Sequence, residues 1–175
     1  TVTAAAVAKA PDGIEILDTR KTLPGYRRLV KYAVFCGGGT NHRIHLSDMA
    51  MIKDNHVSAA GGLRPAADAV RAHFPGLPLE IEIDRIEQLE ETLAVHPRVI
   101  LLDNMDRNRI EEACARIRLL PESERPLIEV SGGWTPDRLH ELAGLGPLGV
   151  SMGYPTHTTR FLDLSLEMGV GGGNR

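Results

Sequence analysis

The 175-residue sequence has few cysteines, few aromatic side chains and no long apolar run. Its two cysteines, Cys36 and Cys114, lie far apart without a C-x-x-C pair, so the sequence predicts neither a zinc site nor a disulfide framework. Aromatic residues make up 4% of the chain, which argues against a base-stacking surface for single-stranded nucleic acid. The short apolar runs exclude a transmembrane helix.

The chain also lacks a large excess of charge of either sign. The formal net charge is -3 and the pI is near 6.1, so no general basic field attracts nucleic acid or a membrane surface. Any cationic site must therefore be local. The chain begins at Thr1 without a recognisable secretory signal, and we expect a cytoplasmic protein.

The hydrophobic content of 42% is enough for one domain over residues 1–175. Short apolar runs alternate with helical patterns, which is typical of parallel βα units. We expect strands at 14–17, 49–52, 79–84, 99–103, 127–130 and 149–152, with helices at 26–35, 60–74, 85–95, 106–119 and 135–143. The prediction is an incomplete, open α/β barrel of about six parallel strands with outer helices, similar to a TIM barrel. Residues 1–13 are expected to be a loose N-terminal edge and 169–175 a flexible tail.

Charged and polar residues follow nearly every expected strand. Parallel barrels place the carboxyl ends of their strands around one mouth, where ligands bind. A candidate cationic pocket is formed by five residues: Arg20, Lys21, His42, Arg43 and Lys53. Arginine holds a carboxylate or phosphate with a planar fork and lysine acts as a point charge, so the pocket suits a substrate with several negative charges. The alternative for each residue alone is ordinary surface charge.

Two acids and two glycine-containing loops complete the expected rim. Glu82 and Asp103 come from successive strands and could bind Mg2+ or sugar hydroxyls. The loops at Ser131-Gly132-Gly133 and Gly153 are interpreted as phosphate cradles, with turn geometry alone as the alternative. We assign ordinary polar roles to Glu80 and Asp84, and a place in the core to Cys114.

Several motifs occur together in one order. They are Asp18-Thr-Arg-Lys-Thr, Pro24-Gly25, Lys31-Tyr32, Gly37-Gly-Gly39, Asn41-His-Arg43, Ile52-Lys-Asp-Asn-His56, Leu102-Asp-Asn104, Glu129-Val-Ser-Gly-Gly133 and Ser151-Met-Gly153. With these motifs the chain closely resembles the C-terminal barrel domain of quinolinate phosphoribosyltransferase, also called nicotinate-nucleotide pyrophosphorylase (carboxylating), from about residue 14 to residue 168.

The resemblance implies a decarboxylating phosphoribosyl transfer in NAD biosynthesis. Quinolinate and phosphoribosyl pyrophosphate (PRPP) would give nicotinate mononucleotide, pyrophosphate and CO2, with Mg2+ as cofactor. By resemblance, the quinolinate carboxylates are held by Arg20, His42, Arg43 and Lys53, the pyrophosphate by Lys21, the ribose and metal by Glu82 and Asp103, and the 5′-phosphate by Ser131, Gly132, Gly153 and His157. Of these, Lys21, Lys53, Glu82 and Asp103 are the candidate catalytic residues.

The family also carries an N-terminal domain that covers the barrel mouth, and we expect no counterpart of it within this chain. A homo-oligomer, a dimer or larger, is expected, together with a possible separate N-terminal domain. Trp134 and Tyr154-Pro155 depart from the family pattern near the phosphate loops. Two alternatives stay open: a truncated, inactive relative that binds phosphorylated metabolites or a partner, and another phosphate-handling barrel enzyme.

Overall fold

The computed structural model describes residues 1–168 and contains one six-stranded sheet in which every pairing is parallel. The strand order is β1-β6-β5-β4-β3-β2, so β1 and β2 are the two edge strands, and Thr40 forms an isolated parallel bridge to Leu17 beside β1. The strands are β1 (Ile14–Leu17), β2 (Ala50–Ile52), β3 (Leu79–Ile83), β4 (Val99–Asp103), β5 (Leu127–Ser131) and β6 (Leu148–Ser151). This confirms the expected open α/β architecture of six parallel strands.

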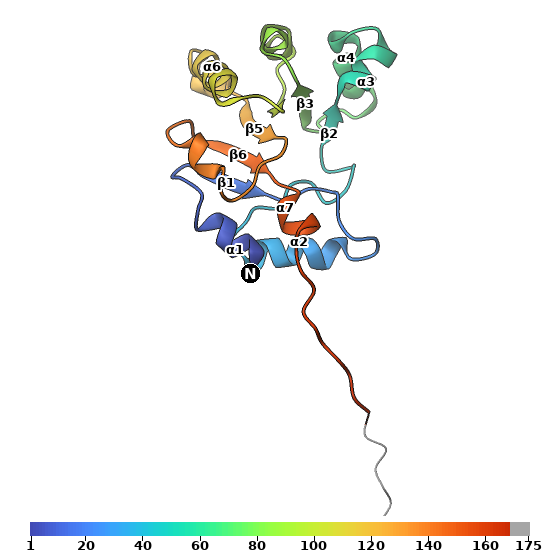
Figure 1. Cartoon of the computed structure of the whole chain (residues 1–175). Coiled ribbons are helices and arrows are strands. Elements are labelled where there is room, and N and C mark those ends of the chain that lie inside the picture. Colours follow the sequence, from blue (N-terminus) through green and yellow to red (C-terminus); the bar gives the residue numbers. More distant parts are fainter. Residues whose placement is uncertain (169–175) are drawn as a thin grey trace, which may run out of the picture.

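Helices connect the strands and cover the sheet. They are α1 (Val2–Val7), α2 (Arg27–Cys36), α3 (Asp54–Ala60), α4 (Leu63–His73), α5 (Leu89–Leu93), α6 (Arg107–Arg118) and α7 (Tyr154–His157), with 3-10 turns η1 (Ile86–Gln88), η2 (Glu122–Glu124) and η3 (Leu139–Leu142). Figure 1 shows α3, α4 and α6 along the upper side of the sheet, and α1 and α2 along its lower side beneath β1.

The two faces of the sheet differ in polarity because strand side chains alternate with period 2. In-register neighbours such as Ile81, Ile100 and Ile128 lie on the face that packs against the helices. The opposite face carries the acidic side chains of β3 and β5, including Glu80 and Glu129. The apolar core therefore lies between sheet and helices, and the polar face is left for chemistry.

The N-terminal segment differs from the expected loose edge. Residues 2–7 form α1, which Thr1 caps, and both Thr3 and Ala6 are buried. A Cβ added to Gly37 would lie 2.6 Å from the Thr3 Cβ, so the glycines after α2 allow α1 to pack closely. The expectation failed because a short helix gains most of its stability from packing, which a local reading of the sequence does not include.

Other differences concern connections. Residues 54–60 form the separate helix α3 before α4, whereas we expected one helix over 60–74. The expected helix at 135–143 is reduced to turns and η3, and the expected helix at 85–95 is split into η1 and α5. The predicted flexible tail at 169–175 lies outside the described residues. Among residues 1–168, no helix combines the length and apolarity needed to cross a bilayer.

Candidate active site

The parallel sheet brings the carboxyl ends of all six strands to one edge. Arg20 and Lys21 follow β1, Lys53 follows β2, and Gly153 follows β6. Glu82 lies within β3, while Asp103 and Ser131 end β4 and β5 and are direct partners in the ladder. The predicted site residues therefore share one rim, with His42 and Arg43 in the loop that crosses from α2 to β2.

Three of the predicted cations have polar partners or charged neighbours among the described residues. Lys53 forms an ion pair with Glu82 on the neighbouring strand. Arg43 donates from a guanidinium nitrogen to the Met49 carbonyl at 2.7 Å. Burial, together with the nearby charges of Arg27 and Arg43, lowers the pKa of Arg20, and its Nε is buried without a hydrogen-bond partner among the described residues. This grouping creates a local positive potential in a chain that is acidic overall.

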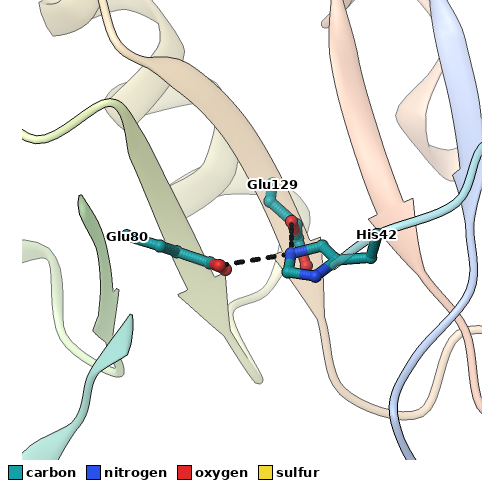
Figure 2. Close-up of side chains that lie close together, drawn as sticks. All are labelled: His42, Glu80 and Glu129. Atoms are coloured by element: carbon teal, nitrogen blue, oxygen red, sulfur yellow. Dashed lines mark ion pairs between the residues drawn. The ribbon is translucent and has the colours of Figure 1, made fainter. Parts of the chain in front are cut away.

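A second cluster lies below these cations. His42 Nε2 is 3.0 Å from Glu129 Oε2 and 3.2 Å from Glu80 Oε2, and all three side chains are buried or nearly so. Figure 2 shows the imidazole from the crossing loop pointing between carboxylates that come from β3 and β5. Ser151 donates its hydroxyl to Glu129 Oε1. His42 Nε2 and Glu80 Oε2 lie at ion-pair distance, but neither His42 Nε2 nor either Glu80 oxygen has a partner of hydrogen-bond geometry in the described part of the chain.

The position of Glu80 corrects the role expected from the sequence. We assigned it an ordinary polar role, whereas its side chain is completely buried and faces His42. Burial raises the pKa of Glu80, and the nearby His42 ring acts to lower it; the net result is a raised pKa. Glu129 was quoted only as part of a motif. The available signal was its position two residues before Ser131, on the same face of the strand.

The three ligand-type side chains of this cluster are close enough to hold a metal ion. The second ring nitrogen argues for a different role. Arg43 donates its backbone N–H to His42 Nδ1 at 2.9 Å, so the neutral ring carries its proton on Nε2, towards the carboxylates. A neutral imidazole that ligates through Nε2 needs the opposite tautomer. The geometry thus describes a histidine whose Nε2 proton faces two acids.

The cluster also controls the charge of His42. Burial lowers its pKa, but the close carboxylates of Glu129 and Glu80 raise it more, to about 10. The two acids therefore favour a protonated ring, and a second proton at Nδ1 would replace the hydrogen bond that the Arg43 N–H makes there. The cluster therefore holds a histidine with a raised pKa between two buried acids.

The expected phosphate loops have distinct backbone geometry. Gly132 has φ of +103°, and a Cβ at this position would lie 2.9 Å from the Asn104 Cα, so only glycine fits between the β4 and β5 loops. A Cβ on Gly153 would lie 2.7 Å from a ring carbon of His157. His157 itself is exposed at the end of the four-residue α7. The loops thus allow close approach to the backbone, which a phosphate site requires.

Trp134 lies beside the first of these loops. It is 5% exposed, and the Arg138 guanidinium stacks 4.7 Å from its ring centroid. The departure from the family pattern that we noted in the sequence therefore fills the core behind the loop.

Comparison with known proteins identifies the domain. A family model described as quinolinate phosphoribosyl transferase, C-terminal domain, matches residues 1–167. The chain belongs to this family. The resemblance read from the motifs is confirmed.

Curated relatives of this quinolinate phosphoribosyl transferase domain carry names from the same enzyme class. The nicotinate-nucleotide pyrophosphorylase (carboxylating) of Mycobacterium leprae is 46% identical over 154 residues, which are 88% of this chain and 54% of that protein. The probable nicotinate-nucleotide pyrophosphorylase (carboxylating) of Bacillus subtilis is 40% identical over 156 residues, covering 89% and 52%. The chain spans about half the length of the curated relatives it matches.

A solved structure has the same fold. The crystal structure of a NadC deletion mutant in a cubic space group superimposes with a TM-score of 0.85 at 40% sequence identity. The match covers 93% of this chain and 56% of that one. The six-stranded sheet is therefore the fold of the quinolinate phosphoribosyl transferase C-terminal domain.

Proposed function

We propose that this domain catalyses phosphoribosyl transfer from PRPP to quinolinate with loss of CO2, giving nicotinate mononucleotide and pyrophosphate. The observation that carries the proposal is the single rim on which the cations, the acids and the two glycine loops meet, in a chain that belongs to this family. The reaction would be one step of NAD biosynthesis, and we keep the cytoplasmic location as a prediction.

The cations suit the acceptor substrate, which carries two carboxylates. Arg20, Arg43 and Lys53 would bind these carboxylates, and arginine can do so with paired hydrogen bonds. The Nε2 atom of His42 faces Glu129 and Glu80 within the protein, so we assign it positive charge near the substrate as its contribution. Lys21, which is exposed after β1, would bind the departing pyrophosphate.

Glu82 and Asp103 would hold the ribose and Mg2+. The register pairs Glu82 with Leu101, so Asp103 lies two residues further along the same face, about 8 Å away across adjacent strands. Mg2+ is commonly bound by one or two carboxylates together with water and substrate phosphates, and this donor set fits it. When bound, the ion would supply positive charge for the pyrophosphate. The 5′-phosphate is assigned to Ser131, Gly132, Gly153 and His157.

The chemical step then depends on how charge is stabilised around the reacting atoms. Breaking the bond to pyrophosphate develops positive charge on the ribose and negative charge on the leaving group, so groups fixed in advance around both lower the barrier. Glu82 and Asp103 would face the ribose, and Lys21 the leaving group. Lys53 or Arg20 would stabilise the electron density that remains on the ring after CO2 departs.

We propose two partners for this domain: a second copy of the chain, and a further domain of the kind that the longer relatives contain. Exposed apolar side chains support both. One set lies on α2, where Leu29, Tyr32 and Phe35 are each at least 63% exposed. The other lies in residues 161–168, an extended segment that leaves the body of the domain. Such patches are typical of interaction surfaces.

The test is formation of nicotinate mononucleotide from quinolinate and PRPP with Mg2+. The 175-residue chain is compared with Lys21→Ala and with Lys9→Ala, a matched lysine that pairs with Asp137 instead. Turnover that is lost only in Lys21→Ala would support the proposal. Absent turnover with retained binding of phthalate, a benzene dicarboxylate, would favour the inactive relative, and absent binding of phthalate and PRPP would refute the pocket.

A further inference from the structure

A buried ion pair lies directly behind the loop that carries His42 and Arg43. Asp18 follows β1, Lys31 lies in the middle of α2, and their Nζ and Oδ1 atoms are 2.5 Å apart. Each side chain is only 2% exposed. The Lys–Asp pair on the outside of the domain, Lys9 with Asp137, is by contrast largely exposed.

The pair holds one residue of the loop by both of its backbone groups. Asp18 Oδ1 accepts from the His42 N–H at 2.9 Å, and Lys31 Nζ donates to the His42 carbonyl at 3.0 Å. With its amide nitrogen turned inwards, Asn41 also donates to Asp18 Oδ2 at 2.6 Å. Hydrogen bonds to ionised partners are about twice as strong as neutral ones, so the backbone at His42 is tightly fixed.

The fixed backbone determines where the next side chains point. The Arg43 N–H donates to His42 Nδ1, and the Arg43 guanidinium reaches the Met49 carbonyl. On the other side of Asp18, the chain continues within two residues to Arg20. One buried carboxylate therefore links the two segments that carry the candidate dicarboxylate ligands.

Stability alone gives little reason for such a pair. Taking two charges out of water is costly, and well-packed apolar side chains in their place are often as stabilising or more so. Burial raises the pKa of Asp18 even though Lys31 and His42 act to lower it, which reflects this cost. The pair is better explained by the orientation it gives to the loop.

We propose that Asp18 and Lys31 are positioning residues that hold the backbone at His42 so that Arg43 and Arg20 converge on a substrate with two adjacent carboxylates. The inference rests on the proposed function and adds the groups that arrange its acceptor site. It predicts that the pair affects binding of the dicarboxylate and leaves the PRPP side of the rim unchanged.

The experiment replaces both charges at once, in Asp18→Leu/Lys31→Met, so that no single buried charge remains. Binding of phthalate and of PRPP with Mg2+ is measured by calorimetry, and folding by circular dichroism. The matched control is Glu112→Gln/Arg116→Met, which removes an exposed pair of the same 2.5 Å separation on α6. We expect phthalate affinity to fall at least tenfold in the first variant, PRPP affinity to stay within twofold, and both to be unchanged in the control.

Several outcomes would overturn the inference. Phthalate affinity within twofold of the parent in a folded Asp18→Leu/Lys31→Met variant would do so, as would an equal loss of both ligands. If that variant does not fold, amide hydrogen exchange of the parent chain decides. We expect slow exchange at the His42 amide, and exchange as fast as in an open loop would overturn the inference that Asp18 and Lys31 hold this backbone. A parent chain that does not bind phthalate refutes the proposed function instead, whatever its exchange shows.

Discussion

The His42 cluster predicts how the stability of the domain changes with pH. His42 has a pKa of about 10 in the folded chain, against 6.5 for an ordinary histidine. The folded state therefore keeps a proton that the unfolded chain loses. The contribution of this group is fully present below pH 6.5 and disappears as pH rises towards 10.

The size of the pH effect on stability follows from the difference between the two pKa values of His42. Each unit of pKa shift corresponds to about 1.4 kcal/mol, so the free energy of unfolding should fall by up to about 5 kcal/mol between pH 6.5 and pH 10. Glu80 adds a loss of the same sign that begins at lower pH, because its pKa is raised from 4.5 by burial and the folded state loses stability as this carboxyl ionises. The free energy of unfolding of a domain of this size is about 5–15 kcal/mol in total, so this loss should be easily measured.

The assay is urea unfolding followed by circular dichroism at intervals from pH 6 to pH 10. The control is His42→Gln, which keeps a polar side chain and removes the titrating group. We expect a steep decline in the parent and a much shallower one in the variant. Equal slopes, or a parent curve that is flat over this range, would refute the assignment of a protonated His42 between two buried acids.

Three further predictions concern other parts of the domain. Gly132→Ala should destabilise the domain by about 1–3 kcal/mol because of the positive φ and the contact with Asn104, and it should weaken PRPP binding. The control is Gly133→Ala, where nothing lies near the new Cβ. Equal losses of stability in the two variants would contradict the steric argument. EDTA should abolish PRPP binding in calorimetry and leave phthalate binding unchanged, and PRPP affinity that survives EDTA would argue against a carboxylate-held Mg2+. A thiol reagent should label the exposed Cys36 in the native chain. Cys114 is buried with a raised thiol pKa and should react only in denaturant. Rapid labelling of both thiols in the native chain would contradict the fold around α6.

The sheet could be predicted from the sequence because each strand is a short apolar run that ends in a recognisable turn. The alternation of residues 79–83 also indicated that the isoleucines and the glutamates face opposite sides. That alternation could not say how deep each glutamate lies. Glu80 is completely buried and Glu82 is at the rim, because the loop from α2 covers one and not the other.

The His42 cluster could not be predicted because its members are far apart in the sequence. His42 meets Glu80 and Glu129 only after six strands have paired, and no local pattern encodes that meeting. Asp18 and Lys31 were recognised as parts of motifs, yet their ion pair needs the packing of α2 against the end of β1. The roles of the rim residues towards substrate and metal stay predictions, and the binding experiments above address them.

Helix α2 has two different faces, and this links the outside of the domain to its chemistry. Lys31 points inwards to hold the backbone at His42, while Leu29, Tyr32 and Phe35 on the same ten-residue helix point outwards and are exposed. An α-helix with its side chains is only about 10 Å thick, so these two faces lie close together. A subunit or domain that grips the outer face and shifts α2 by a fraction of a turn would therefore also shift the loop that carries Arg43, so that assembly could tune the acceptor site without reaching into it.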